Sequence, residues 1–182
     1  MHKETVVLLH AVPHAGPLSL LADRLAATHR VIRVGLGAGA AQPPSNLAGL
    51  LGGGAAAHLV AQGAALGHAL GLAQACPDRI SSLVLIEPVQ AGRTSCAAEP
   101  GIAQPVCLIG RILSGLRVHA EMRRLGDALA NAEQHFFIDD PADTQATDRS
   151  IAELVLAFLH RHGNGDRRRS TLPSLRECSL AA

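Results

Sequence analysis

Short, continuous apolar runs alternate with amphipathic stretches along most of this chain. The apolar runs are rich in β-branched and aliphatic residues, which is typical of strands buried on both faces of a parallel sheet. We predict strands at 5–10, 31–34, 59–61, 80–86, 106–109 and 133–138. The amphipathic stretches predict helices at 18–28, 63–75 and 119–130, and a last helix from 150 onward.

The start of the last helix carries a sequence signal of its own. Ser150 is followed three residues later by Glu153, which is the spacing of a capping box. The stretch 139–147 before it is acidic and polar, and we expect it to form a loop. The pattern therefore places the first residue of this helix at Ser150.

Strands alternate with helices six times, which predicts the α/β class. We expect a three-layer α/β/α sandwich around a mostly parallel, doubly wound sheet of about six strands. A chain of 182 residues fits a single domain of this kind, which we place at 1–162. The polar segment 163–182 is expected to be a flexible tail.

Composition and charge narrow the classes of partner. The chain has no Trp or Tyr and three Phe, so stacking on nucleobases is not an expected binding mode. The formal net charge of +1 favours neither nucleic acid nor an anionic membrane. We therefore expect no nucleic acid and no membrane among the partners, and no apolar run reaches the roughly 18 residues of a membrane helix.

The cysteines and the first residues bear on the compartment. The four cysteines show no C-x-x-C spacing, and a chain of this length has no need of disulfide staples. The first residues run directly into a strand, without the pattern of a signal peptide. We therefore expect reduced thiols and a cytoplasmic protein.

The stretch from His58 to Gly67 predicts a short strand that turns sharply into a helix of small residues. This is the layout of a nucleophile elbow, whose pattern is G-x-S-x-G. The same five places here read Ala61-Gln62-Gly63-Ala64-Ala65, so Gly63 occupies the place of the nucleophile. Because such a turn strains most residues but not glycine, we predict a positive φ at Gly63.

Other segments resemble the α/β-hydrolase superfamily in their order and spacing. Leu8-Leu9-His10, followed by a Gly/Pro turn, resembles the corner that helps to form the oxyanion hole. The segment 77–88 is similar to the one that follows the elbow helix. The resemblance covers roughly residues 5–161 and implies the α/β-hydrolase fold. It also makes His10, Ala11, Gln62 and Ala64 the candidate residues of an oxyanion corner or pocket.

The resemblance implies a nucleophile, an acid and a histidine in that chain order. The nucleophile's place is Gly63, the place of the acid at 110–113 has no carboxylate, and 139–149 contains no histidine. Glu87 ends a strand where some relatives carry the acid, but we expect it to contact nearby backbone. We therefore identify no catalytic residue, and expect a non-catalytic protein that binds a small molecule or a protein partner.

Two alternatives remain open. The first is an esterase-like hydrolase with displaced groups, in which His10 or His14 is the base. Its nucleophile would be one of three serines, Ser45, Ser95 or Ser114. The second alternative is a degenerate sequence without an evolved activity. The chain also lacks edge and cap segments of its relatives, so we expect exposed sheet edge that a second copy of the chain would cover.

No cofactor or metal is expected. The segment 35–40 fits G-x-G-x-x-A, but the prolines that follow prevent the helix that a dinucleotide site needs. The ten histidines show no zinc-ligand spacing. Cys107 lies within a strand and is expected to be a buried, unreactive thiol.

Overall fold

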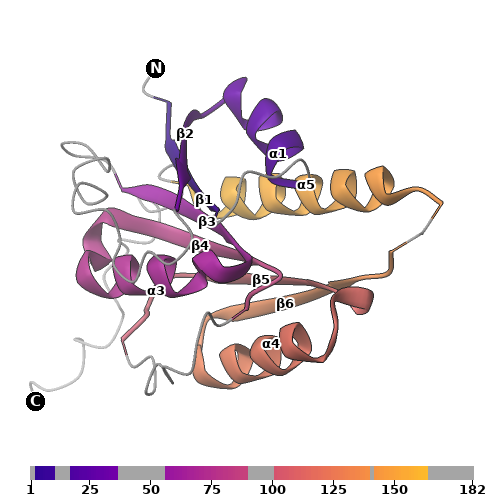
Figure 1. Ribbon diagram of the computed structural model, residues 1–182. Helices are drawn as coiled ribbons and strands as arrows, with labels where there is room; N and C mark the ends of the chain where they lie inside the picture. Colours follow the sequence, from indigo (N-terminus) through magenta and orange to yellow (C-terminus); the bar gives the residue numbers. More distant parts are fainter. Residues whose placement is uncertain (1–2, 11–16, 37–55, 90–100, 140–141, 164–182) are drawn as a thin grey trace, which may run out of the picture.

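A computed structural model describes residues 3–10, 17–36, 56–89, 101–139 and 142–163. Six parallel strands form one sheet in the order β2-β1-β3-β4-β5-β6 (Figure 1). The strands are β1 (Thr5–His10), β2 (Arg30–Gly35), β3 (Ala57–Gln62), β4 (Ile80–Ile86), β5 (Val106–Arg111) and β6 (Ala132–Phe137). The predicted parallel, six-stranded sheet is confirmed.

The strands differ in burial according to their place in the sheet. The central strands β3, β4 and β5 are buried almost throughout, as their continuous apolar sequences predict. The edge strands β2 and β6 instead contain exposed and half-buried residues. The exposed side chains of the described sheet therefore lie on its two edge strands.

Helices cover both faces of the sheet, which makes the three layers seen in Figure 1. The helices α1 (Pro17–Ala26) and α5 (Thr144–Arg161) pack on one face, where Leu21 and Phe158 share an apolar cluster. The helices α3 (Leu66–Ala75) and α4 (Leu116–Ala128) pack on the other, with Leu66 and Met122 in its cluster. The three-layer α/β/α prediction is thus confirmed.

The predicted start of the last helix is wrong. Helix α5 begins at Thr144, six residues before the proposed capping box. Asp143 caps it, since its Oδ1 accepts a hydrogen bond from the backbone N–H of Ala146 at 2.9 Å. Ser150 lies inside the helix, where its hydroxyl donates to the carbonyl of Ala146 at 3.0 Å. Two residues thus carried cap-like signals, and the earlier one starts the helix.

Several expectations fall on residues outside the described ranges. These are the oxyanion-corner residue Ala11, His14, Ser45, Ser95, the glycine-rich segment after Leu36 and all of the tail beyond Gly163. Among the helices of the described ranges, none combines the length and the apolar character that crossing a membrane demands.

Candidate functional site

The corner after β3 has the geometry that the elbow pattern predicts. Gln62 is still extended, with φ −118° and ψ 136°, and Gly63 then takes φ +58°. A short 3-10 turn, η1 (Gly63–Ala65), leads directly into α3. The predicted positive φ of Gly63 is confirmed, and this one residue turns the chain from strand into helix.

No described residue fills the space beside Gly63. A Cβ built on this residue would meet no atom of the described chain within 4 Å, apart from its chain neighbours. The next residue, Ala64, is exposed, and the carbonyl of Gly63 accepts a hydrogen bond from the N–H of Val89 at 3.3 Å. The corner is therefore anchored through its backbone and has room for a side chain that this sequence does not place there.

The corner borders the point where the sheet changes its winding direction. The chain runs from β1 outward to β2 and then returns to β3 on the other side of β1. In open parallel sheets, ligands bind outside the carboxyl ends of the strands at such a point. The register pairs His10 with Gln62 at these ends. The imidazole of His10 lies over Gly35, with Cε1 3.4 Å from the position of a Cβ on that glycine.

A second corner, after β5, is crowded with charges. The guanidinium of Arg111 contacts three carboxylates from three different segments. It lies 3.1 Å from Oδ1 of Asp139, 3.6 Å from Oε1 of Glu87, and in hydrogen-bonding contact with Asp148. These four residues, which we call the Arg111 cluster, stand where the resemblance places the acid and the histidine. The corner thus holds a fixed cation between anions.

Burial and pairing have opposite effects on Arg111. Desolvation alone would lower the pKa of its guanidinium. The hydrogen bond to Asp148 and the charges of Glu87, Asp148 and Asp139 outweigh this effect and raise the pKa. The arginine is therefore a permanent positive charge at this edge of the sheet.

Glu87 makes more contacts than the sequence predicts. Its backbone takes a positive φ of 48°, and its N–H donates to the carbonyl of Ile109 at 2.7 Å. Its carboxylate, however, contacts side chains: Ser114, on the short turn η3 (Ile112–Ser114), donates its hydroxyl to Oε1 at 2.5 Å. The expected contact with nearby backbone is present, and Arg111 and Ser114 in addition reach the same carboxylate oxygen.

His119 is engaged by backbone, and His10 lies far from Ser114. Nε2 of His119 lies 3.2 Å from the carbonyl of Arg111 and 3.0 Å from that of Ile112, so it fastens the η3 turn. His10 is on β1, which is three strand spacings, about 14 Å, from β5. The structure therefore does not bring His10 and Ser114 together as base and nucleophile.

A serine, a histidine and a carboxylate do meet at the opposite, amino end of the sheet. Nδ1 of His58 lies 2.8 Å from the hydroxyl of Ser82, and its Nε2 lies 3.6 Å from Oε2 of Glu4. His58 and Ser82 are completely buried between β3 and β4. Because no substrate can reach this hydroxyl, we assign the contact to the packing of the sheet.

A third group, Cys107, Glu133 and His135, is the one set of metal-type ligands in the described residues whose donor atoms lie close together. The sequence analysis missed it because the donors come from two strands. Glu133 and His135 alternate on β6, and Cys107 is the register partner of Glu133 on β5. A Glu-x-His pair in an edge strand was the available signal. This group lies within the sheet face, away from both corners.

No protein-family model matches the sequence, and no curated protein matches it either. Solved structures do match. The protein Rv0554 of Mycobacterium tuberculosis is 17% identical, with a TM-score of 0.65 over 88% of this chain and 91% of that one. A thermophilic esterase from Thermogutta terrifontis is 11% identical, with a TM-score of 0.62 over 89% and 92%.

An alpha/beta hydrolase from Sphaerobacter thermophilus is 15% identical, with a TM-score of 0.56 over 84% of this chain and 92% of that one. The likeness at such low identity is one of backbone arrangement, and the strand order and the turn at Gly63 both agree with it. The chain therefore has the α/β-hydrolase fold.

Proposed function

We propose that this chain is a non-catalytic α/β-hydrolase-fold protein that binds a small molecule or a protein partner. The observation that carries the proposal is Gly63 at the strand-to-helix corner. In this fold, acyl transfer begins with attack by a side-chain nucleophile from that corner. A glycine supplies no such atom, and its neighbours Gln62 and Ala64 supply none either.

The Arg111 cluster supports the same proposal on electrostatic grounds. A catalytic acid stabilises the positive charge that develops on the histidine. Here the corresponding corner holds three carboxylates, but each of them is paired with the guanidinium of Arg111. The three carboxylates of the cluster are already engaged with this cation, so they are poorly suited to orient a histidine.

The region around the winding point is the proposed small-molecule site. His10, Gln62 and Gly63 meet at the carboxyl ends of β1 and β3, and the exposed Ala64 follows them. An imidazole and an amide offer hydrogen bonds to a neutral polar ligand. With Ala11, these are the residues that we propose for binding, with backbone N–H groups of the turn as further donors.

A separate set of exposed apolar side chains supports a protein partner. The set, which we call the apolar patch, lies on η3, at the start of α4 and along the end of β6. Its members are Ile112, Leu113, Leu116, Phe136 and Ile138. Five large apolar residues exposed on neighbouring elements are unusual on an isolated monomer. Since β6 is also an edge strand of the described sheet, we propose a second copy of this chain as the partner.

Assays of ester hydrolysis and of serine labelling test the proposal directly. We expect purified protein to give no turnover of p-nitrophenyl esters above the buffer rate, and no labelling by a fluorophosphonate probe. The variant Gly63→Ser should remain nearly inactive, because a hydroxyl at the corner still has no histidine to deprotonate it. Esterase activity that rises strongly in Gly63→Ser would overturn the proposal.

One contact favours the alternative of a hydrolase with displaced groups. The hydroxyl of Ser114 lies 2.5 Å from Glu87, so a carboxylate is in place to accept its proton. This alternative predicts turnover and labelling that disappear in Ser114→Ala but persist in Ser150→Ala, a control at an exposed serine of α5. The non-catalytic proposal predicts that neither substitution changes the background rate.

A further inference from the structure

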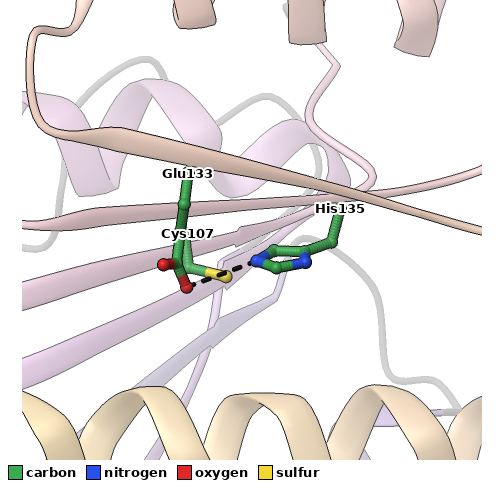
Figure 2. A group of neighbouring side chains, drawn as sticks. All are labelled: Cys107, Glu133 and His135. Carbon is green, nitrogen blue, oxygen red and sulfur yellow. Dashed lines mark ion pairs between the residues drawn. The ribbon is translucent and has the colours of Figure 1, made fainter.

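Three potential metal ligands converge on the sheet face beneath α5. Figure 2 shows the side chains of Cys107, Glu133 and His135 directed toward one another from the neighbouring strands β5 and β6. One sulfur, one carboxylate oxygen and one ring nitrogen lie within 4.8 Å of each other. Cys107 belongs to the apolar cluster that α1 and α5 cover, so the group lies at the border between the core and the edge strand.

We propose that Cys107, Glu133 and His135 form a binding site for Zn²⁺. Zinc accepts sulfur, nitrogen and oxygen ligands together, whereas Mg²⁺ and Ca²⁺ prefer oxygen ligands. This site is distinct from the corners at Gly63 and Arg111, and does not depend on the function proposed for them.

The spacing of the two donors on β6 fits a tetrahedral ion. Oε1 of Glu133 and Nε2 of His135 are 3.3 Å apart. Two ligands bound to zinc at 2.0–2.1 Å with a tetrahedral angle between them lie about 3.3–3.4 Å apart. The pair therefore already has the separation that a shared metal requires.

The ring nitrogen of His135 is available as a ligand. Its Nε2 is shielded from solvent and makes no hydrogen bond to any described residue, although the side chain as a whole is 36% exposed. Its contact with Oε1 of Glu133 is an ion pair without hydrogen-bond geometry, and a shielded polar atom that makes no hydrogen bond calls for an explanation such as an ion. A metal bound between Nε2 and Glu133 would satisfy this nitrogen.

Cys107 joins the site only through loss of its proton. Burial, followed by the charge of Glu133 and a hydrogen bond to it, raises the pKa of the Cys107 thiol to about 12. The thiol is thus protonated in the metal-free protein and unreactive, as the sequence predicts. When zinc binds, the S–H bond breaks, a Zn–S bond forms and the proton passes to solvent.

The fourth position of the ion has a route to water. Glu133 lines an open pocket of about 500 Å³, which Asn131 and His162 also line. Three protein ligands with an open fourth position leave room for a water molecule. The ion would tie the edge strand β6 to β5, and its exchange with solvent would pass through this pocket.

Arg161 is the competitor for this site. Its NH2 group lies 2.7 Å from Oε1 of Glu133, the same oxygen that faces His135. The guanidinium also lies over the ring of Phe158, 5.7 Å from its centroid. A bound cation must displace Arg161 from this oxygen, so removal of the arginine is expected to strengthen metal binding. A purely structural cluster would show no such gain.

Cobalt titration of the full-length, reduced, chelator-treated protein tests the site. Co²⁺ bound by a thiolate in tetrahedral geometry gives a charge-transfer absorption in the near ultraviolet and intense visible bands, and Zn²⁺ bleaches both by displacement. We expect wild type to show these bands. Glu133→Gln and His135→Gln should weaken cobalt binding at least about tenfold, and Cys107→Ala should abolish the charge-transfer band.

Two further variants decide the assignment. Arg161→Gln should bind cobalt several-fold more tightly than wild type, whereas Cys76→Ala, a control at a cysteine outside the cluster, should bind as wild type does. Glu133→Gln keeps the size of the side chain, so the test stands even if Cys107→Ala fails to fold. Wild type without the bands, bands that survive in Cys107→Ala, or bands lost in Cys76→Ala would each overturn the proposal.

Discussion

At the carboxyl edge of the sheet, the corner after β3 and the corner after β5 are stabilised in different ways. After β3, the chain turns through Gly63, which has no side chain and no described atom within 4 Å of the position of a Cβ, its chain neighbours aside. After β5, the chain turns beside Arg111, which gathers Glu87, Asp139 and Asp148 around one guanidinium. One corner is held by backbone geometry and the other by charge.

The two corners therefore place different demands on the residues that form them. The turn at Gly63 requires only a residue that accepts a positive φ, and glycine does so without cost. The corner after β5 brings polar groups out of water, and these must be paired. The first corner is therefore expected to be sensitive to the backbone conformation of its residue, and the second to changes in charge.

Removal of the arginine at the second corner should have the largest effect. Arg111→Ala leaves three partly buried carboxylates without their common cation, and we expect a loss of about 2–4 kcal/mol in the free energy of unfolding. Urea denaturation followed by circular dichroism measures this loss. The matched control is Arg24→Ala, which removes an exposed pair with Glu153 and should cost at most about 1 kcal/mol. Equal losses in both variants would contradict the assigned role of the Arg111 cluster.

The backbone conformation of the corner after β3 can be tested by replacing each of two glycines, separately, with alanine. Neither Gly63 nor Gly71, in the middle of α3, would bring a new Cβ within 4 Å of a described atom, chain neighbours and α3's own backbone aside. Gly63→Ala should destabilise by about 1–2 kcal/mol, because alanine is strained at a positive φ. Gly71→Ala should stabilise by about 0.5–1 kcal/mol, because alanine favours a helix. The same denaturation experiment applies, and a shift of the same sign in both variants would contradict the conformation of Gly63.

The apolar patch beside the second corner should have the smallest effect on stability and a distinct effect on assembly. Leu113 is 70% exposed and Leu116 is 90% exposed, so a Leu113→Glu/Leu116→Glu variant should change the unfolding free energy of the monomer by less than about 0.5 kcal/mol. Light scattering after gel filtration should show dimeric wild type and a monomeric variant. The exposed substitution Gln74→Glu on α3 serves as the control, and monomeric wild type would exclude self-association through this patch.

The sequence predicts the sheet well because the relevant signal is local. Strand β4 was expected at 80–86 and is observed there. A short, continuous run of aliphatic residues is typical of a strand that is buried on both faces. The positive φ of Gly63 was likewise predicted from a pattern five residues long. The start of α5 was missed because Asp143 and Ser150 both resemble caps, and local sequence does not rank them.

The polar groupings were harder to predict, because they depend on residues far apart in the chain. Arg111 meets Asp148 across 37 positions, a pairing that no periodicity reveals. The same holds for Cys107 and Glu133, which become neighbours only through the register of β5 and β6. Helices and strands can be predicted from neighbouring residues, whereas these sites require the arrangement of the strands.

The packing of α1 against α5 has a consequence for the order of folding. Leu21 of α1 and Phe158 of α5 belong to one apolar cluster, which also covers Val6 on β1. During synthesis, the first strand and helix therefore leave the ribosome long before the segment that completes their core. The apolar side of β1 stays incompletely covered until α5 has emerged. The core on this face of the sheet is therefore completed by α5, which contains nearly the last of the described residues. Contacts between such distant segments predict slow folding, and a truncation that removes α5 would leave an aggregation-prone sheet.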